Sequence, residues 1–187
     1  MRAIVITLAF TLLAAAAAAQ QPAAPPAVQA IKTYTSSADV AALIVKAKNE
    51  RKADQAVFSQ PLLSLAPYNA ILEYRGIVGP AAVHEREMEI FYIVEGTATM
   101  VTGGKLVKET RTNPTNLSGT AIEGGTSQTV SKGDFIIVPE NTPHWFSMIS
   151  GNGVLVDVSI HLPRPVPSFA EMERLVPAVT GTPQPPR

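Results

Sequence analysis

From residue 57 onward, the chain consists of short runs of β-forming residues separated by Gly, Pro, Asn and Ser. The runs that we predict as strands are residues 57–65, 68–75, 89–95, 97–101, 126–130, 135–138, 144–149 and 154–161. Many short strands with regular turn residues between them are typical of an all-β sandwich or barrel. The pattern therefore predicts a single β domain rather than an alternating α/β fold.

Ahead of the strands, residues 38–53 carry a helical pattern. Apolar side chains recur three or four positions apart, at Val40, Leu43, Ile44 and Ala47. This spacing places them on one face of an α-helix. Ser36 and Asp39 match a capping box at its start. We predict a short N-terminal helix whose apolar face packs on the outside of the barrel.

Two segments lack a clear apolar period. Residues 108–125 contain several pairs of turn-forming residues, among them Asn113-Pro114 and Gly124-Gly125. We interpret this segment as a long inserted loop, which in compact domains commonly acts as a lid or mobile element. Residues 163–187 are so rich in proline that they leave room for one short helix at about 168–175. We expect them to form a tail.

The N-terminus has the features of an export sequence. A basic start at Arg2 precedes an uncharged, alanine-rich run over residues 3–18, and small residues lead up to Gln20. This arrangement predicts a cleaved signal peptide over residues 1–19 and a periplasmic or secreted protein. The alternative is an uncleaved membrane anchor, but the run is short, and alanine partitions weakly into lipid. We therefore expect no stable membrane anchor after cleavage.

These patterns divide the chain into four parts. The parts are a signal peptide over 1–19, a Pro/Ala-rich linker over 20–35, a β-barrel domain with its helix over 36–162 and a tail over 163–187. Lys plus Arg and Asp plus Glu each number 15 in the 187 residues, so the formal net charge is zero. Nucleic-acid binding is not expected, since it depends on a basic surface. The absence of cysteine excludes disulfides and thiolate metal sites.

The candidate chemistry lies at two of the three histidines. His84 is followed after four residues by Glu89, and His144 lies after Pro143 at the start of a predicted strand. Imidazole nitrogen and carboxylate oxygen together suit a divalent transition metal such as Zn, Mn, Fe or Ni. Two histidines and one carboxylate can hold one face of such a metal and leave other positions for water or substrate.

At these residues the sequence resembles the cupin family. The first family motif, G-x5-H-x-H-x3,4-E-x6-G, matches in its spacing from Gly76 to Gly96, with His84 as the second histidine and Glu89 as the acid. The second motif, G-x5-P-x4-H-x3-N, matches at Gly133, Pro139 and His144, and Met148 stands at its asparagine position. The resemblance covers about residues 76–149. It implies an all-β, cupin-type jelly-roll barrel and a metal site on His84, Glu89 and His144.

The chain departs from the motif at one ligand position. Ala82 stands where the family has its first histidine, and alanine cannot bind a metal. A second registration would make His84 the first histidine and Arg86 the second, but Gly76 and the gap to Glu89 favour His84 as the second. We expect the three remaining ligands to hold the metal, with water in the vacated position.

Alternation along the strands predicts which residues line the pocket. If Glu89 points inward, Phe91 and Ile93 point to the same side, and Ala82 shares a side with His84. Trp145, beside His144, is a further candidate for the lining. His161 ends the last predicted strand, directly before Leu162-Pro163. It could be a fourth ligand by proximity, but we expect it at the rim or surface of the barrel. The facing of Glu73, Tyr74 and Arg75 stays open.

Two functions are compatible with this sequence. In the first, an exported metal-binding cupin acts on a small organic molecule as a dioxygenase, lyase or isomerase, classes that the family resemblance allows. In the second, a periplasmic cupin binds a small molecule without turnover, either with or without a metal. The retained Glu89 and the insertion favour the first, whereas Ala82 favours the second. Since cupins commonly pair through an apolar outer face, we also expect a homodimer.

Overall fold

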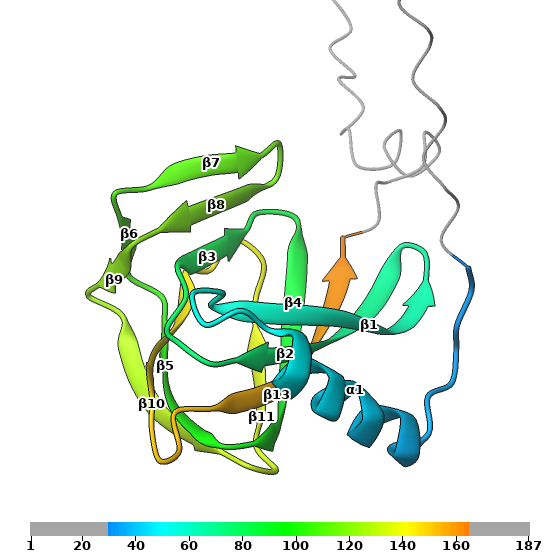
Figure 1. The fold of residues 1–187 in the computed structure, drawn as a ribbon. Coiled ribbons are helices and arrows are strands. Elements are labelled where there is room, and N and C mark those ends of the chain that lie inside the picture. The colour runs from blue at the N-terminus through cyan, green and yellow to red at the C-terminus, as the bar shows by residue number, and fades with distance from the viewer. Residues whose placement is uncertain (1–29, 165–187) are drawn as a thin grey trace, which may run out of the picture.

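A computed structural model describes residues 30–164 of the chain. Two antiparallel sheets face each other as a jelly roll, with one helix on the outside and a small two-stranded sheet at one end (Figure 1). The predicted all-β class and cupin-type architecture are confirmed. The expected signal peptide over 1–19 and the helix at 168–175 lie outside the described residues.

The first sheet has five strands in the order β1-β2-β13-β4-β11. Its strands are β1 (Val57–Leu65), β2 (Tyr68–Arg75), β13 (Leu155–Pro163), β4 (Glu87–Glu95) and β11 (Phe135–Val138). The C-terminal strand β13 therefore lies between two strands from the first half of the chain. Its register pairs His161 with Asn69 on one side and with Glu89 on the other.

The second sheet has six strands in the order β10-β5-β12-β3-β8-β7. Its strands are β10 (Thr126–Ser131), β5 (Thr97–Thr102), β12 (His144–Ile149), β3 (Ala81–His84), β8 (Asn116–Gly119) and β7 (Thr110–Asn113). A third, two-stranded sheet joins β6 (Lys105–Val107) to β9 (Ala121–Glu123).

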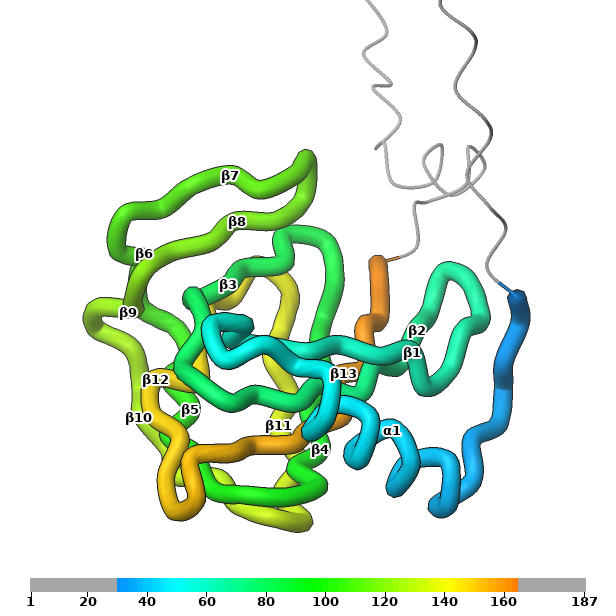
Figure 2. Tube along the Cα trace, viewed as in Figure 1, coloured from blue at the N-terminus to red at the C-terminus, as the bar shows by residue number. Residues whose placement is uncertain are grey.

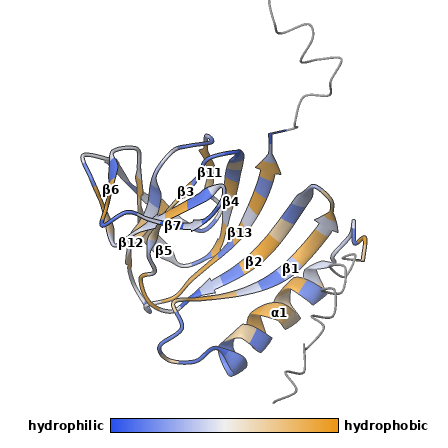
Figure 3. Cartoon of the chain, turned by 90° about the horizontal axis from the view of Figure 1, so that it is seen from above, coloured by the Kyte–Doolittle hydropathy of each residue, from blue (hydrophilic) through white to orange (hydrophobic). Residues whose placement is uncertain are grey.

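Helix α1 (Ser37–Glu50) begins with the predicted capping box, in which Ser36 and Asp39 each bind the backbone N–H of the other. The helix lies along the outer face of β1 and β2, with its apolar side toward the sheet (Figure 3). The outer cluster that it covers contains the buried side chains Leu62, Leu72 and Tyr74. The helix therefore explains why β2 is apolar on its outer face.

A second cluster fills the space between the two sheets. Its buried members include Phe91 and Ile93 from β4, Met100 from β5, Phe146 from β12 and Leu155 from β13. These side chains alternate with the outward-facing residues of the same strands, as a half-buried β-strand requires. The cluster supports the inner end of the cavity described below.

The segment over 108–125 differs from the predicted loop. It contains the hairpin of β7 and β8 and then β9, and β8 extends the second sheet beside β3 (Figure 2). Gly124, with a φ of +72°, lies in a turn, whereas Asn113, Asn116 and Gly119 belong to the strands. The prediction of a structureless insertion is therefore wrong. Over residues 30–164, no helix has both the length and the apolar character needed to cross a membrane.

Candidate metal centre

His84 and Glu89 approach each other because the chain crosses from one sheet to the other between them. His84 ends β3 of the second sheet, and Glu89 lies two residues into β4 of the first. Both side chains point into the space between the sheets, where His84 Nε2 lies 3.3 Å from Glu89 Oε2. The motif spacing therefore places an imidazole and a carboxylate on facing sheets.

His144 reaches the same carboxylate oxygen from β12. Its register partner on β3 is Ala82, and its Nε2 lies 3.1 Å from Glu89 Oε2. The three residues proposed from the sequence as metal ligands therefore lie together in the structure. Glu89, only 4% exposed, stands at their centre.

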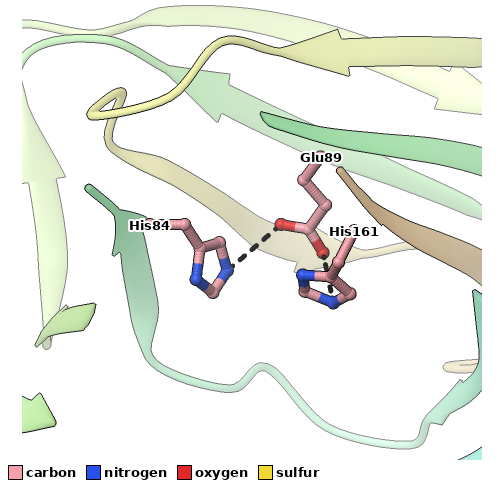
Figure 4. A group of neighbouring side chains, drawn as sticks. All are labelled: His84, Glu89 and His161. Carbon is pink, nitrogen blue, oxygen red and sulfur yellow. Dashed lines mark ion pairs between the residues drawn. The ribbon is translucent and has the colours of Figure 1, made fainter. Parts of the chain in front are cut away.

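His161 also belongs to this group, and the prediction that it lies at the rim or surface is wrong. Its side chain is 15% exposed, and its Nε2 lies 3.6 Å from Glu89 Oε1. Figure 4 shows His84 and His161 both pointing toward the Glu89 carboxylate. The candidate ligand atoms of these three residues all lie within 4.8 Å of one another. The strand position beside Leu162-Pro163 was misleading because β13 lies in the middle of its sheet.

The outer nitrogens of two histidines face hydrogen-bond acceptors. His144 Nδ1 lies 3.0 Å from the carbonyl oxygen of Thr142, and His84 Nδ1 lies 3.1 Å from Asn116 Oδ1. A carbonyl oxygen only accepts, so each Nδ1 carries the proton and donates it. With the Nδ1 proton accepted outside the cluster, Nε2 is the nitrogen of each ring that a metal beside Glu89 can bind, which is the arrangement of metal-binding histidines.

The electrostatics of the cluster favour a bound cation. Burial by itself raises the pKa of Glu89, but its contacts with His144 and His84 hold that pKa well below the usual range. Burial lowers the pKa of His84, yet the nearby Glu89 carboxylate outweighs burial and leaves it above the ordinary value. Glu89 Oε2 is buried without a hydrogen-bond partner. Two imidazole nitrogens close to such a carboxylate oxygen form a set of donor atoms that fits a positive ion.

A cavity of about 230 Å³ opens beside the cluster. Of the residues predicted to line it, Ala82, Phe91 and Trp145 do so. Ile93 shares a side of β4 with Phe91 but is fully buried in the inner cluster. Trp145 is held by a hydrogen bond of 2.8 Å from its Nε1 to the carbonyl oxygen of Gly79.

The inner part of the cavity holds a buried group of charges on β2 and β13. Glu73 and Arg75 line the cavity, whereas Tyr74 points to the helix side, which settles the facing that the sequence left open. Glu73 and Asp157 are register partners across the two strands, and the Arg75 guanidinium binds both carboxylates, with 2.8 Å from its Nε to Asp157. The guanidinium also lies 4.8 Å above the Phe146 ring.

Sequence reasoning missed Asn116 as a member of the site and favoured the rim over the site for His161. Alternation from Ser159, whose Oγ lies 3.0 Å from His161 Nε2, could have placed both on one side of β13. It could not have shown that this side faces Glu89. Asn116 carried no signal, because it belongs to a segment outside both motifs.

The chain matches the sequence model of the family described as "Cupin" over residues 47–179. A comparison with curated proteins found no match. Among solved structures, an iron(II) form of HppE is 15% identical, with 59% of this chain and 53% of that chain covered and a TM-score of 0.45. This chain therefore spans about half the length of HppE.

Two further solved structures have similar scores. KdgF from Halomonas sp. is 17% identical, with 62% of this chain and 87% of that chain covered and a TM-score of 0.44. A protein from Bacillus halodurans is also 17% identical, with coverages of 66% and 80% and a TM-score of 0.43.

Proposed function

The chain belongs to the cupin family, and from the residues gathered between its sheets we propose that it binds one divalent transition metal and acts there on a small organic molecule. His84, Glu89 and His144 are the proposed ligands, and His161 is a fourth. A set of three imidazoles and one carboxylate is suited to Zn, Mn, Fe or Ni.

One observation carries this proposal. Glu89 Oε2 is buried, has no hydrogen-bond partner, and is approached by the Nε2 atoms of His84 and His144 at 3.3 and 3.1 Å. Both imidazoles donate their Nδ1 protons outward, to Asn116 and Thr142. An ionised carboxylate in such a place is costly without a cation.

A metal in this position would supply a Lewis acid that polarises a substrate oxygen. The chain's own residues provide the surroundings. Phe91 and Phe146 supply apolar lining, while Ala82, the register partner of His144, adds only a small side chain there. Arg75 is held in place by two carboxylates and can donate a hydrogen bond to a bound molecule. A cavity of about 230 Å³ suits a small ligand.

Metal analysis of the purified, untagged protein tests the ligand set. After reloading with Zn, Mn, Fe and Ni in turn, we expect close to one metal per chain with at least one of these ions. Glu89→Gln and His144→Ala should lose it, while the exposed Glu123→Gln should not. Substoichiometric binding of all four metals by the unaltered chain would contradict the proposal.

Catalysis requires a separate test, because a binding protein could hold the same metal. The metal-loaded protein should convert at least one member of a panel of small oxygen-containing compounds, followed by mass change and by oxygen uptake. Activity should disappear on chelation and return with metal. If compounds of the panel bind to the protein but none is converted, the result would favour a non-catalytic binding protein.

We also propose that residues 1–19 direct export to the periplasm and are removed there. The basic start and the alanine-rich run support this, and mass spectrometry of a periplasmic extract tests it. An intact Met1 species would contradict cleavage.

A homodimer is proposed as well. Phe135 and Ile137 on the edge strand β11 are 72% and 60% exposed, which supports a covered apolar edge. Sedimentation of the unaltered chain and of Ile137→Lys tests this: the first should be a dimer and the second a monomer.

A further inference from the structure

The hairpin of β7 and β8 lies directly beside the candidate metal centre. It arises from the segment over 108–125, which neither family motif includes, and β8 pairs with β3 along the whole length of both strands. In that register Asn116 is the partner of His84. Figures 1 and 2 show the hairpin extending the second sheet past β3, at the end where β3 turns into β4.

Asn116 contacts the nitrogen of His84 that faces away from Glu89. The distance from His84 Nδ1 to Asn116 Oδ1 is 3.1 Å. Glu87 Oε1 also faces this nitrogen, but at 3.7 Å, beyond hydrogen-bond distance. Asn116 is therefore the acceptor for the Nδ1 proton, which leaves Nε2, on the Glu89 side, as the nitrogen that a metal can bind.

The turn that follows His84 is tied to the same hairpin. The Arg111 guanidinium makes two parallel contacts to the Glu85 carboxylate, at 2.8 and 2.9 Å. The backbone N–H of Glu85 donates to the carbonyl oxygen of Thr115 at 2.8 Å. An exposed ion pair adds little stability, but a two-pronged contact fixes orientation. The hairpin therefore holds both the ring of His84 and the backbone next to it.

We infer that Asn116 is a positioning residue of the metal centre, and that the β7–β8 hairpin serves to hold His84 as its Nδ1–H tautomer with Nε2 aimed at Glu89. This inference rests on the proposed metal centre. It gives the inserted segment a role that a lid or mobile loop would not have. Groups that accept from the far nitrogen of a metal-binding histidine typically affect metal affinity by about 10- to 100-fold.

Three variants separate the hydrogen bond from the shape of the hairpin. Asn116→Leu removes the acceptor at similar size, and Asn116→Asp keeps an acceptor oxygen. Asn113→Leu is the matched control: it alters the register partner of Asn116 in the same hairpin. A fourth variant combines Asn116→Leu with Glu87→Gln, so that the Glu87 carboxylate cannot accept the His84 Nδ1 proton in place of Asn116.

Two measurements are made on untagged protein. The first is affinity for the metal that the unaltered chain binds best, from competition with a chelator. The second is the ¹⁵N NMR spectrum of the protein loaded with diamagnetic Zn, which reports the metal-bound ring nitrogen of each of the three histidines in the chain. We expect Asn116→Leu to weaken binding by about 10- to 100-fold and to reduce the share of His84 that binds through Nε2 as the Nδ1–H tautomer. Asn116→Asp should bind at least as tightly as the unaltered chain, and Asn113→Leu should bind similarly to it.

The outcomes distinguish this inference from the proposed function. If Asn116→Leu and its double variant leave affinity and tautomer unchanged, the inference is overturned. It is also overturned if Asn113→Leu or Asn116→Asp loses as much affinity as Asn116→Leu, because the effect would then come from the hairpin's fold or from any change at residue 116. If the unaltered chain binds no metal, the proposed function fails and the inference falls with it, whereas an unaltered chain that binds metal and an Asn116→Leu variant that binds it equally well overturn the inference alone.

Discussion

His161 and Glu89 are direct partners in the register between β13 and β4, and His161 Nε2 lies 3.6 Å from Glu89 Oε1. Ala82, the position where the cupin motif has its first histidine, lies on β3 in the opposite sheet. The chain lacks the imidazole that the motif has at residue 82, and His161 on β13 supplies one from a different strand. The group around Glu89 still contains three imidazoles.

The first prediction concerns an exchange between these two positions. His161→Ala should weaken metal affinity by about 100-fold or more, since loss of a direct ligand should exceed loss of an orienting contact. Ala82→His alone should change affinity less, because three imidazoles are already present. Adding Ala82→His to His161→Ala should restore much of the lost affinity, measured by calorimetric titration. Failure of this rescue would indicate that the two positions are not equivalent around the metal.

The second prediction uses the stability that a ligand confers on the folded state. At a free metal concentration of 100 times the dissociation constant, unfolding should cost about 2.7 kcal/mol more than in chelator. Glu89→Gln should remove most of this difference, because the amide lacks the negative charge that attracts the metal. Thermal unfolding with and without metal measures it. Equal stabilisation of both proteins would place the metal elsewhere.

The third prediction concerns Asp157, which is fully buried beside Arg75. Burial raises the pKa of Asp157 from 3.8 to about 7, in spite of the opposing effect of Arg75. Between pH 3.8 and about 7, Asp157 therefore keeps its proton in the folded state and has lost it in the unfolded state. The resulting stability is fully present below pH 3.8 and is lost as the pH rises through about 7.

Asp157→Asn should remove this dependence. Relative to the unaltered chain, its free energy of unfolding should rise between pH 4 and 7, by at most about 1.4 kcal/mol per pH unit. Urea unfolding of the metal-free proteins measures this difference, with the exposed Asp54→Asn as the control. Parallel pH profiles for Asp157→Asn and the unaltered chain would contradict the raised pKa.

The fourth prediction compares two glycines of the family motifs. Gly96 and Gly133 have nearly the same positive φ, +97° and +95°. A Cβ at Gly133 would meet open space, whereas one at Gly96 would collide with the carbonyl oxygen of Val154. Gly133→Ala should cost about 1 kcal/mol of stability, and Gly96→Ala about 1–3 kcal/mol more. Urea unfolding of both variants checks the difference, which would vanish if Val154 can move aside.

The elements that the sequence predicted well are those with local causes. Residues 57–65 and 135–138 were predicted with the bounds that β1 and β11 have, because turn residues mark their ends. The helix start followed from the capping box of Ser36 and Asp39. The strands over 105–123 were missed because their Gly and Asn residues resemble those of a loop, and only pairing with β3 and with one another reveals them as strands.

The candidate site was predictable to the extent that it lies within the two motifs. The spacing around His84, Glu89 and His144 placed these residues together, as the structure does. His161 and Asn116 depend on which strands are neighbours, and neighbours far apart in sequence leave no local pattern. Ile93 shows a related limit, since alternation gives the side of a strand but not the depth at which a side chain lies.

The position of β13 between β2 and β4 has a consequence for synthesis of the protein. Until a ribosome has added residue 163, the first sheet lacks its middle strand, and the facing edges of β2 and β4 have nothing to pair with. Pairing of strands so distant in sequence is slow compared with local contacts. The growing chain therefore cannot complete its barrel early, and a truncation before residue 155 would leave two separate sheet fragments rather than a shorter barrel.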